Sequence, residues 1–187
     1  ILALWVNLLS ALLTLSATLF YVFVYTLWLK RSTPQNIVIG GAAGAVPPLV
    51  GWAAVTGGID LPALYLFTII FFWTPPHFWA LALLLRGDYA QAGVPMLPVV
   101  RGVSHTTQSM VLYVLVLLAI TTLFFTTQAV GWIYLAGSSV AGVLFLLLTL
   151  RLLRTFTLRH ARQVYLYSLF YLAGLFSLIV LDTTLAV

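Results

Sequence analysis

Residues 71–98 read FFWTPPHFWALALLLRGDYAQAGVPMLP. The first half of this stretch is apolar, and its first charged residue is Arg86. The apolar run begins further back, at Leu61. It therefore exceeds the roughly 20 residues that a helix needs to cross the hydrocarbon core of a bilayer. This stretch predicts a transmembrane helix that ends in a polar connection.

The composition of the whole chain agrees with a membrane protein. Of its 187 residues, 63% are hydrophobic and 6% are charged, whereas soluble domains carry about 25% charged residues. A soluble globular protein is therefore excluded. The absence of cysteine excludes disulfides, a thiol nucleophile and Cys-ligated metal sites. The net charge of +5 reflects scarce acids rather than a dense basic face, which excludes a nucleic-acid partner.

Apolar runs long enough to span a membrane occur six times, and they lack the alternation of barrel strands. The predicted fold class is all-α, a polytopic transmembrane helical bundle forming a single domain over residues 1–187. Residues 1–6 resemble the end of a preceding transmembrane helix, so we expect an N-terminally truncated sequence. The predicted helices cover residues 8–29, 37–56, 61–85, 109–127, 132–150 and 164–181.

The basic residues predict the orientation of the helices. Every Lys and Arg falls on an alternate connection: two in the first, two in the third and four in the fifth. Cytoplasmic loops carry such an excess of bases. We therefore expect the loops at Lys30, 86–107 and 151–163 to face the cytoplasm, or the matrix of a mitochondrion, in an inner membrane. The C-terminus, Asp60 and Asp182 are expected on the opposite side.

The longest predicted connection, residues 86–107, contains the only acid on the basic side. Asp88 lies between Arg86 and Arg101. A carboxylate of this kind can bind Mg²⁺ while arginines bind phosphate. The spacing alone favours a plainer interpretation, a juxtamembrane ion pair with anchoring bases.

The first connection offers a second cationic group beside aromatic side chains. Tyr21 and Tyr25 share a helix face, and Lys30 and Arg31 end the helix. On a regular helix Lys30 lies about 140° from Tyr25, so it reaches a shared ligand only through its flexible stem. An aromatic belt with snorkelling bases is the alternative, and these residues alone favour it.

Two further features lie at membrane depth. Pro75 and Pro76 are expected to bend their helix, and they place His77 within the span, where ionisable groups are costly. His77 can serve as a haem-iron ligand, a general base or a donor to a buried carbonyl, or it can be structural. Gly40 and Gly44 form a GxxxG pattern, which favours close helix packing over room for a flat ligand.

Four motifs together resemble a known family. They are the YTxxLKR segment starting at Tyr25 with a later asparagine, GAxPPLxGWAA, PPHFWALA and DYxxxGxPMLPV. In this order they are similar to the haem O synthase family, a branch of the intramembrane UbiA-type aromatic prenyltransferase superfamily. The resemblance covers nearly the whole chain and implies a bundle of nine helices, of which six are present here.

The resemblance also implies a reaction. Farnesyl diphosphate would transfer its farnesyl group to a vinyl group of haem B, giving haem O and pyrophosphate. The implied partners are haem B, farnesyl diphosphate, the lipid bilayer and a haem A synthase, and Mg²⁺ would bind the diphosphate.

Site residues follow from the matched motifs. Asp88 would hold Mg²⁺, and the bases would neutralise the leaving diphosphate. Aromatic faces would stabilise the allylic cation, and His77 would bind the haem iron. The expected catalytic residues are Asp88, Lys30, Arg86 and Tyr25; the expected substrate-binding residues are His77, Tyr21, Arg31, Asn36, Trp73, Phe78 and Arg101.

The sequence departs from the superfamily pattern in two ways. Ala92 stands where the usual DxxxD motif has its second acid, which weakens a generic assignment more than a haem-directed one. The first Asp-rich loop of the family has no counterpart, so we expect the chain to hold half of the metal site. Two alternatives stay open: a prenyltransferase for a quinone precursor, and a haem-binding membrane protein or transporter without catalysis.

Overall fold

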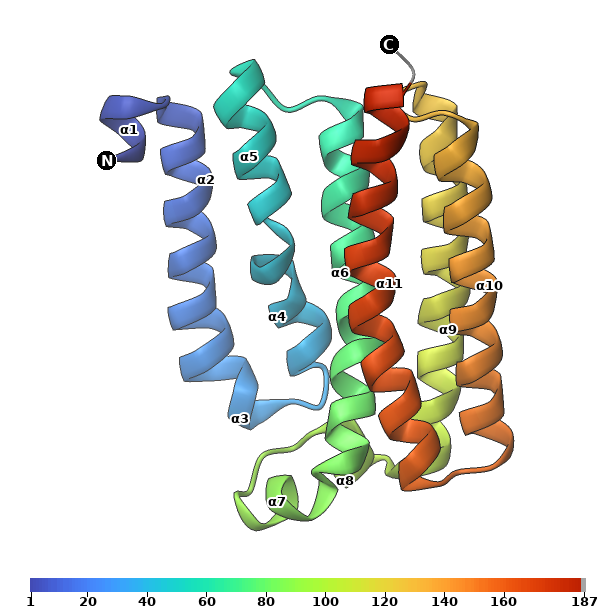
Figure 1. The fold of residues 1–187 in the computed structure, drawn as a ribbon. Coiled ribbons are helices and arrows are strands. Elements are labelled where there is room, and N and C mark those ends of the chain that lie inside the picture. Colours follow the sequence, from blue (N-terminus) through green and yellow to red (C-terminus); the bar gives the residue numbers. More distant parts are fainter. Residues whose placement is uncertain (186–187) are drawn as a thin grey trace.

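The computed structural model describes residues 1–185, and this part of the chain consists of helices joined by turns and loops, without strands (Figure 1). A short helix, α1 (Leu2–Trp5), precedes the long ones. Six helical segments are long and apolar enough to cross a membrane, which confirms the predicted fold class. They are Leu8–Ser32, Asn36–Thr56, Leu61–Leu84, Gly102–Thr127, Trp132–Arg154 and Leu158–Leu185.

Four of these helices form a closed bundle. Helix α6 (Leu61–Leu84) contacts α9 (Gly102–Leu123) and α11 (Leu158–Leu185), and α10 (Trp132–Arg154) contacts α9 and α11. Large buried side chains such as Trp79, Phe145 and Tyr171 fill the space between them. Burial of this apolar surface and tight packing hold the bundle together. Pro75 and Pro76 lie inside α6, which runs without interruption through both.

The first two membrane spans lie against one side of this bundle and are each composite. The second span consists of α4 (Asn36–Ala45) and α5 (Pro47–Thr56), joined at Val46. Proline lacks an N–H, so Pro47 suits the first turn of a new helix. The first span consists of α2 (Leu8–Leu19), a π-helix η1 (Phe20–Leu29) and α3 (Lys30–Ser32). It contacts α4 and α5, and its outer face is exposed (Figure 1).

The π-helix corrects the expected direction of Lys30. A π-helix bonds each residue to the one five positions earlier, instead of four. The Lys30 N–H accordingly donates to the Tyr25 carbonyl, and the Thr26 hydroxyl donates to the Tyr21 carbonyl. Lys30 therefore lies one turn beyond Tyr25, and not about 140° around a regular helix.

The long connection expected at residues 86–107 is mostly helical. It contains α7 (Arg86–Gln91) and α8 (Leu97–Val100), and α9 begins at Gly102, seven residues before the predicted start. Met96 is buried with Ile37 and Ala82, and Tyr89 packs against this cluster. The apolar side chains of the connection therefore pack against the start of α4 and the end of α6. The expected connection at 151–163 is also shorter, because α10 continues to Arg154 and α11 begins at Leu158.

Charge is divided between the two ends of the bundle. The basic residues lie on or beside α3, α7, α8, the end of α10 and the start of α11, which share the lower end in Figure 1. Asp60, before α6, and Asp182, near the end of α11, lie at the upper end. Asp182 is buried and accepts hydrogen bonds from the N–H groups of Gly131 and Ile133. Asp182 lies within α11, because this helix continues to Leu185, beyond its predicted end at residue 181.

Candidate functional site

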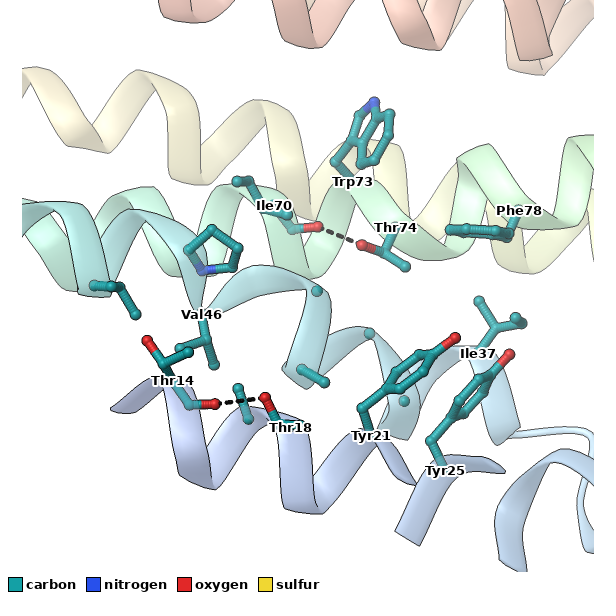
Figure 2. A pocket seen from close by; sticks show the side chains of 17 residues that line it. Thr14, Thr18, Tyr21, Tyr25, Ile37, Val46, Ile70, Trp73, Thr74 and Phe78 are labelled. Atoms are coloured by element: carbon teal, nitrogen blue, oxygen red, sulfur yellow. Dashed lines mark hydrogen bonds between the residues drawn. The ribbon is translucent and has the colours of Figure 1, made fainter. Parts of the chain in front are cut away.

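A cavity of about 670 Å³ lies between the first two spans and α6 (Figure 2). This volume falls within the range of small-molecule sites. Aliphatic and aromatic side chains dominate its wall, and none of the residues lining it is charged. The hydroxyls of Thr14, Thr18 and Thr74 donate to carbonyls of their own helices. The cavity therefore suits an apolar ligand.

Four aromatic residues expected at the site line the cavity, and two of them, Tyr21 and Tyr25, lie at one end of it. Tyr21 and Tyr25, from η1, have ring centroids 5.4 Å apart. Their hydroxyls point the same way, toward Ile37 and Phe78 in Figure 2. Trp73 and Phe78 contribute from α6 on the facing wall, and the Trp73 indole is directed away from the tyrosines, toward α11. All four residues therefore border one cavity.

The glycines of α4 give the cavity its width. A Cβ atom on Gly40 would overlap the Tyr25 ring, whereas one on Gly44 would meet nothing within 4 Å. Both glycines line the cavity. Of the two glycines in the GxxxG pattern, only Gly40 packs closely against a neighbouring helix, and its contact is the Tyr25 side chain. At Gly44 the missing side chain leaves open space.

The expected charged residues gather at the end of the bundle nearest the tyrosines, outside the cavity itself. Lys30, Arg31, Arg86, Asp88 and Arg101 are all exposed. None of them lines the cavity. They lie at the end of the bundle that follows the two tyrosines along the first span.

One buried cluster links this charged region to the cavity. Ile37 lines the cavity and belongs to the cluster with Met96. Tyr89, the neighbour of Asp88 on α7, packs against the same cluster. The position of the Asp88 backbone is therefore tied to the cavity wall.

Asp88 fits a shared magnesium site. Mg²⁺ is usually held through one or two carboxylates together with substrate phosphates. Asp88 offers one exposed carboxylate in the first turn of α7. Within residues 1–185, no group of three His, Cys, Asp or Glu side chains is placed to hold a metal. Asp88 is therefore the one carboxylate that the described residues bring to this end of the bundle.

Asn36 begins α4 beside this region and is almost fully buried. Its side-chain amide donates to the Lys30 carbonyl over 3.4 Å. Its Oδ1 is buried without a partner in the described part of the chain. Asn36 thus fixes the turn that carries Lys30, and it keeps one free acceptor.

His77 points away from the cavity, toward α11. It is buried, and its Nδ1 lies 2.7 Å from the Ser168 hydroxyl. Its ring stacks between Trp73 and Tyr165. His77 is not among the described residues that line the cavity. The hydrogen bond to Ser168 differs from the bond to a proline-freed carbonyl considered from the sequence, while iron ligation stays a prediction.

Several residues of the cavity wall were not expected from sequence. Thr14 and Thr18 lie on the same side of the first span as Tyr21 and Tyr25. Their spacing of four, three and four residues is the signal that could have revealed them. Val46 and Ile70 come from other spans, and no local pattern marks them.

Comparison with known proteins identifies the family. The UbiA prenyltransferase family matches residues 1–175. Relatives described as protoheme IX farnesyltransferase are 57% identical in Roseiflexus sp. (strain RS-1), 52% in Alkalilimnicola ehrlichii and 51% in Gloeobacter violaceus. These matches cover 97%, 100% and 98% of this chain, but 34%, 62% and 60% of the relatives. The chain thus spans at most about three-fifths of their length. No solved structure matches the chain.

Proposed function

The chain belongs to the UbiA prenyltransferase family, and on that basis we propose that it transfers the farnesyl group of farnesyl diphosphate to a vinyl group of haem B. The single observation that carries the proposal is the cavity. It is apolar, four aromatic residues line it, and its end with Tyr21 and Tyr25 adjoins the basic end of the bundle. A molecule with an apolar isoprenoid chain and an anionic diphosphate matches an apolar cavity beside a basic end. The name shared by the most similar relatives supports haem as the acceptor.

The charged end would bind the diphosphate. Lys30, Arg31, Arg86 and Arg101 are exposed there. Mg²⁺ held through Asp88 would neutralise charge on the leaving group. Because Lys30 lies one turn beyond Tyr25, its ammonium group and the tyrosine ring can act at the same end of a ligand.

The aromatic end would hold the reacting carbon. When the bond from farnesyl C1 to the diphosphate oxygen breaks, pyrophosphate leaves with the electron pair and an allylic cation remains. The faces of Tyr21, Tyr25, Trp73 and Phe78 can stabilise that cation. The vinyl group of haem B then supplies the electron pair for the new carbon–carbon bond. Water quenches the cation left on the porphyrin side chain and releases a proton.

The rest of the arrangement follows from this reaction. Asn36 would orient the Lys30 turn against the diphosphate, and His77 would contact the porphyrin. We assign the basic end to the cytoplasmic side of an inner membrane, because bases accumulate on that side. Haem O would then pass to a haem A synthase.

The test is product formation by membranes that contain the protein. Haem B, farnesyl diphosphate and Mg²⁺ should give a farnesylated haem detected by mass spectrometry, and EDTA should abolish it. Parallel reactions should contain 4-hydroxybenzoate in place of haem. Prenylation of that acceptor, with none of haem, would favour the quinone-precursor alternative. Haem binding without any farnesyl transfer would favour a non-catalytic haem protein.

A further inference from the structure

Ser168 contacts two residues of α6 with two different groups. Its hydroxyl lies 2.7 Å from Nδ1 of His77. Its backbone carbonyl accepts a hydrogen bond of 2.8 Å from Nε1 of Trp73. Ser168 itself is fully buried on α11. One residue of the four-helix bundle is thus bonded to both aromatic side chains.

The hydrogen bonds around Ser168 determine where its proton lies. The Ser168 Oγ is 2.6 Å from the Tyr165 carbonyl oxygen. Two oxygens this close require a hydrogen between them, and the carbonyl has none to give. The hydroxyl therefore donates to the carbonyl of Tyr165. Because a serine has one hydroxyl proton, Ser168 can only accept from His77.

This donor assignment fixes the form of His77. Nδ1 must carry a hydrogen, so a neutral His77 is the Nδ1–H tautomer with its lone pair on Nε2. The stacking agrees with a fixed ring: the centroid of His77 is 4.4 Å from that of Trp73 and 5.0 Å from that of Tyr165. Trp73, which stacks on this ring, is among the residues that line the cavity.

We propose that Ser168 is a positioning residue. It locks His77 as the Nδ1–H tautomer and, through His77 and its own carbonyl, holds the Trp73 indole as a fixed wall of the cavity. A rigid wall reduces the ordering that a bound ligand must impose on its site. The effect on substrate binding rests on the proposed function. The tautomer of His77 and the fixed position of the Trp73 indole are independent of that function.

The first experiment needs no substrate. Replacement of His105 and His160 by Gln leaves His77 as the only histidine, and its ¹⁵N spectrum in purified, labelled protein reports which nitrogen is protonated. We expect Nδ1–H in the wild-type background and in Ser168→Thr, which keeps a hydroxyl. We expect a changed tautomer ratio in Ser168→Ala. An Nε2–H tautomer in the wild-type background would overturn the proposal.

The second experiment follows Trp73 and the kinetics. With 5-fluorotryptophan, the resonance of Trp73 is assigned by its loss in Trp73→Phe. Ser168→Ala should shift it and raise KM for farnesyl diphosphate about fivefold to tenfold, the usual weight of one hydrogen bond, with a smaller change in kcat. Ser177→Ala is the matched control, because Ser177 is exposed on the same helix and bonds only to the Ala173 carbonyl.

The outcomes separate the two proposals. An unmoved Trp73 resonance and tautomer in Ser168→Ala would refute the positioning role, whatever the enzyme makes. If both move as expected but no farnesylated haem forms with any variant, the proposed function fails and the positioning role stands.

Discussion

The ring of Tyr25 packs directly against the backbone of Gly40, leaving no space for a side chain on that glycine. Tyr25 is on η1 and Gly40 is on α4, so this contact sets the distance between the first two spans. It also sets the position of the tyrosine ring in the cavity wall. The contact therefore joins helix packing to the geometry of the aromatic end.

Gly40→Ala should displace Tyr25 and lower kcat/KM on the order of 10²-fold, because misplacing a group by about 1 Å can cost that much. Steady-state farnesyl transfer measures the effect. Gly51→Ala is the control, since a Cβ there meets nothing within 4 Å and Gly51 does not line the cavity. Equal kinetics for the two variants would contradict a role for the Tyr25 position.

Asp88→Asn should remove the carboxylate that we propose as the Mg²⁺ ligand. We expect kcat to fall about 10²-fold, comparable with the loss of one group that stabilises developing charge. The Mg²⁺ concentration for half-maximal rate should rise as well. Asp60→Asn is the control, because Asp60 lies at the opposite end of the bundle and bonds the Trp52 indole. An Asp88→Asn protein with normal Mg²⁺ dependence would exclude the metal role.

Local sequence signals predicted the membrane spans, the separation of charge and the shared helix face of Tyr21 and Tyr25. Each depends on residues close along the chain: apolar runs, bases in connections, and Tyr21 four residues before Tyr25. The pairing of His77 with Ser168 joins positions 91 residues apart, and only the packing of α6 against α11 creates it. The π-helix could not be predicted either, because the angle between Tyr25 and Lys30 was calculated for a regular α-helix with 3.6 residues per turn.

The connection at residues 86–107 shows a different limit. Its polar ends predicted a loop, but its apolar residues form short helices on the cluster of Ile37, Ala82 and Met96. Tertiary burial therefore decided its structure, as it does for most short helices. Asp88 and its Mg²⁺ role were reached from sequence, and their test is still the experiment above.

Met96→Ala should loosen the connection that carries Asp88. Met96 is 3% exposed, and truncating such a side chain costs about 2–5 kcal/mol. Because the cluster is separate from the main core, we expect easier proteolysis of residues 86–101 and a raised KM for farnesyl diphosphate. Met110→Ala, in the main core, should instead lower the unfolding midpoint of the whole bundle. Identical proteolysis patterns for the two variants would contradict separate anchoring.

Asp182→Asn should destabilise the far end of the bundle without altering the chemistry. The Asp182 carboxylate accepts from the N–H groups of Gly131 and Ile133, at the start of α10. Those N–H groups have no partner within a helix, and a carboxylate there also interacts favourably with the helix dipole. Losing the charge and one acceptor should cost about 1–2 kcal/mol of unfolding free energy.

The measurement is reversible unfolding in detergent, with kcat/KM of the folded protein as the second readout. Thr184→Ala is the control on the same helix end, because its hydroxyl is exposed and bonds only within α11. Gly131→Ala provides an independent check, since its Cβ would lie 3.2 Å from both carboxylate oxygens of Asp182. Both Asp182→Asn and Gly131→Ala should unfold more easily while kcat/KM stays at the wild-type value. A loss of kcat/KM at unchanged stability would instead place Asp182 in the reaction, which its position opposite the basic end argues against.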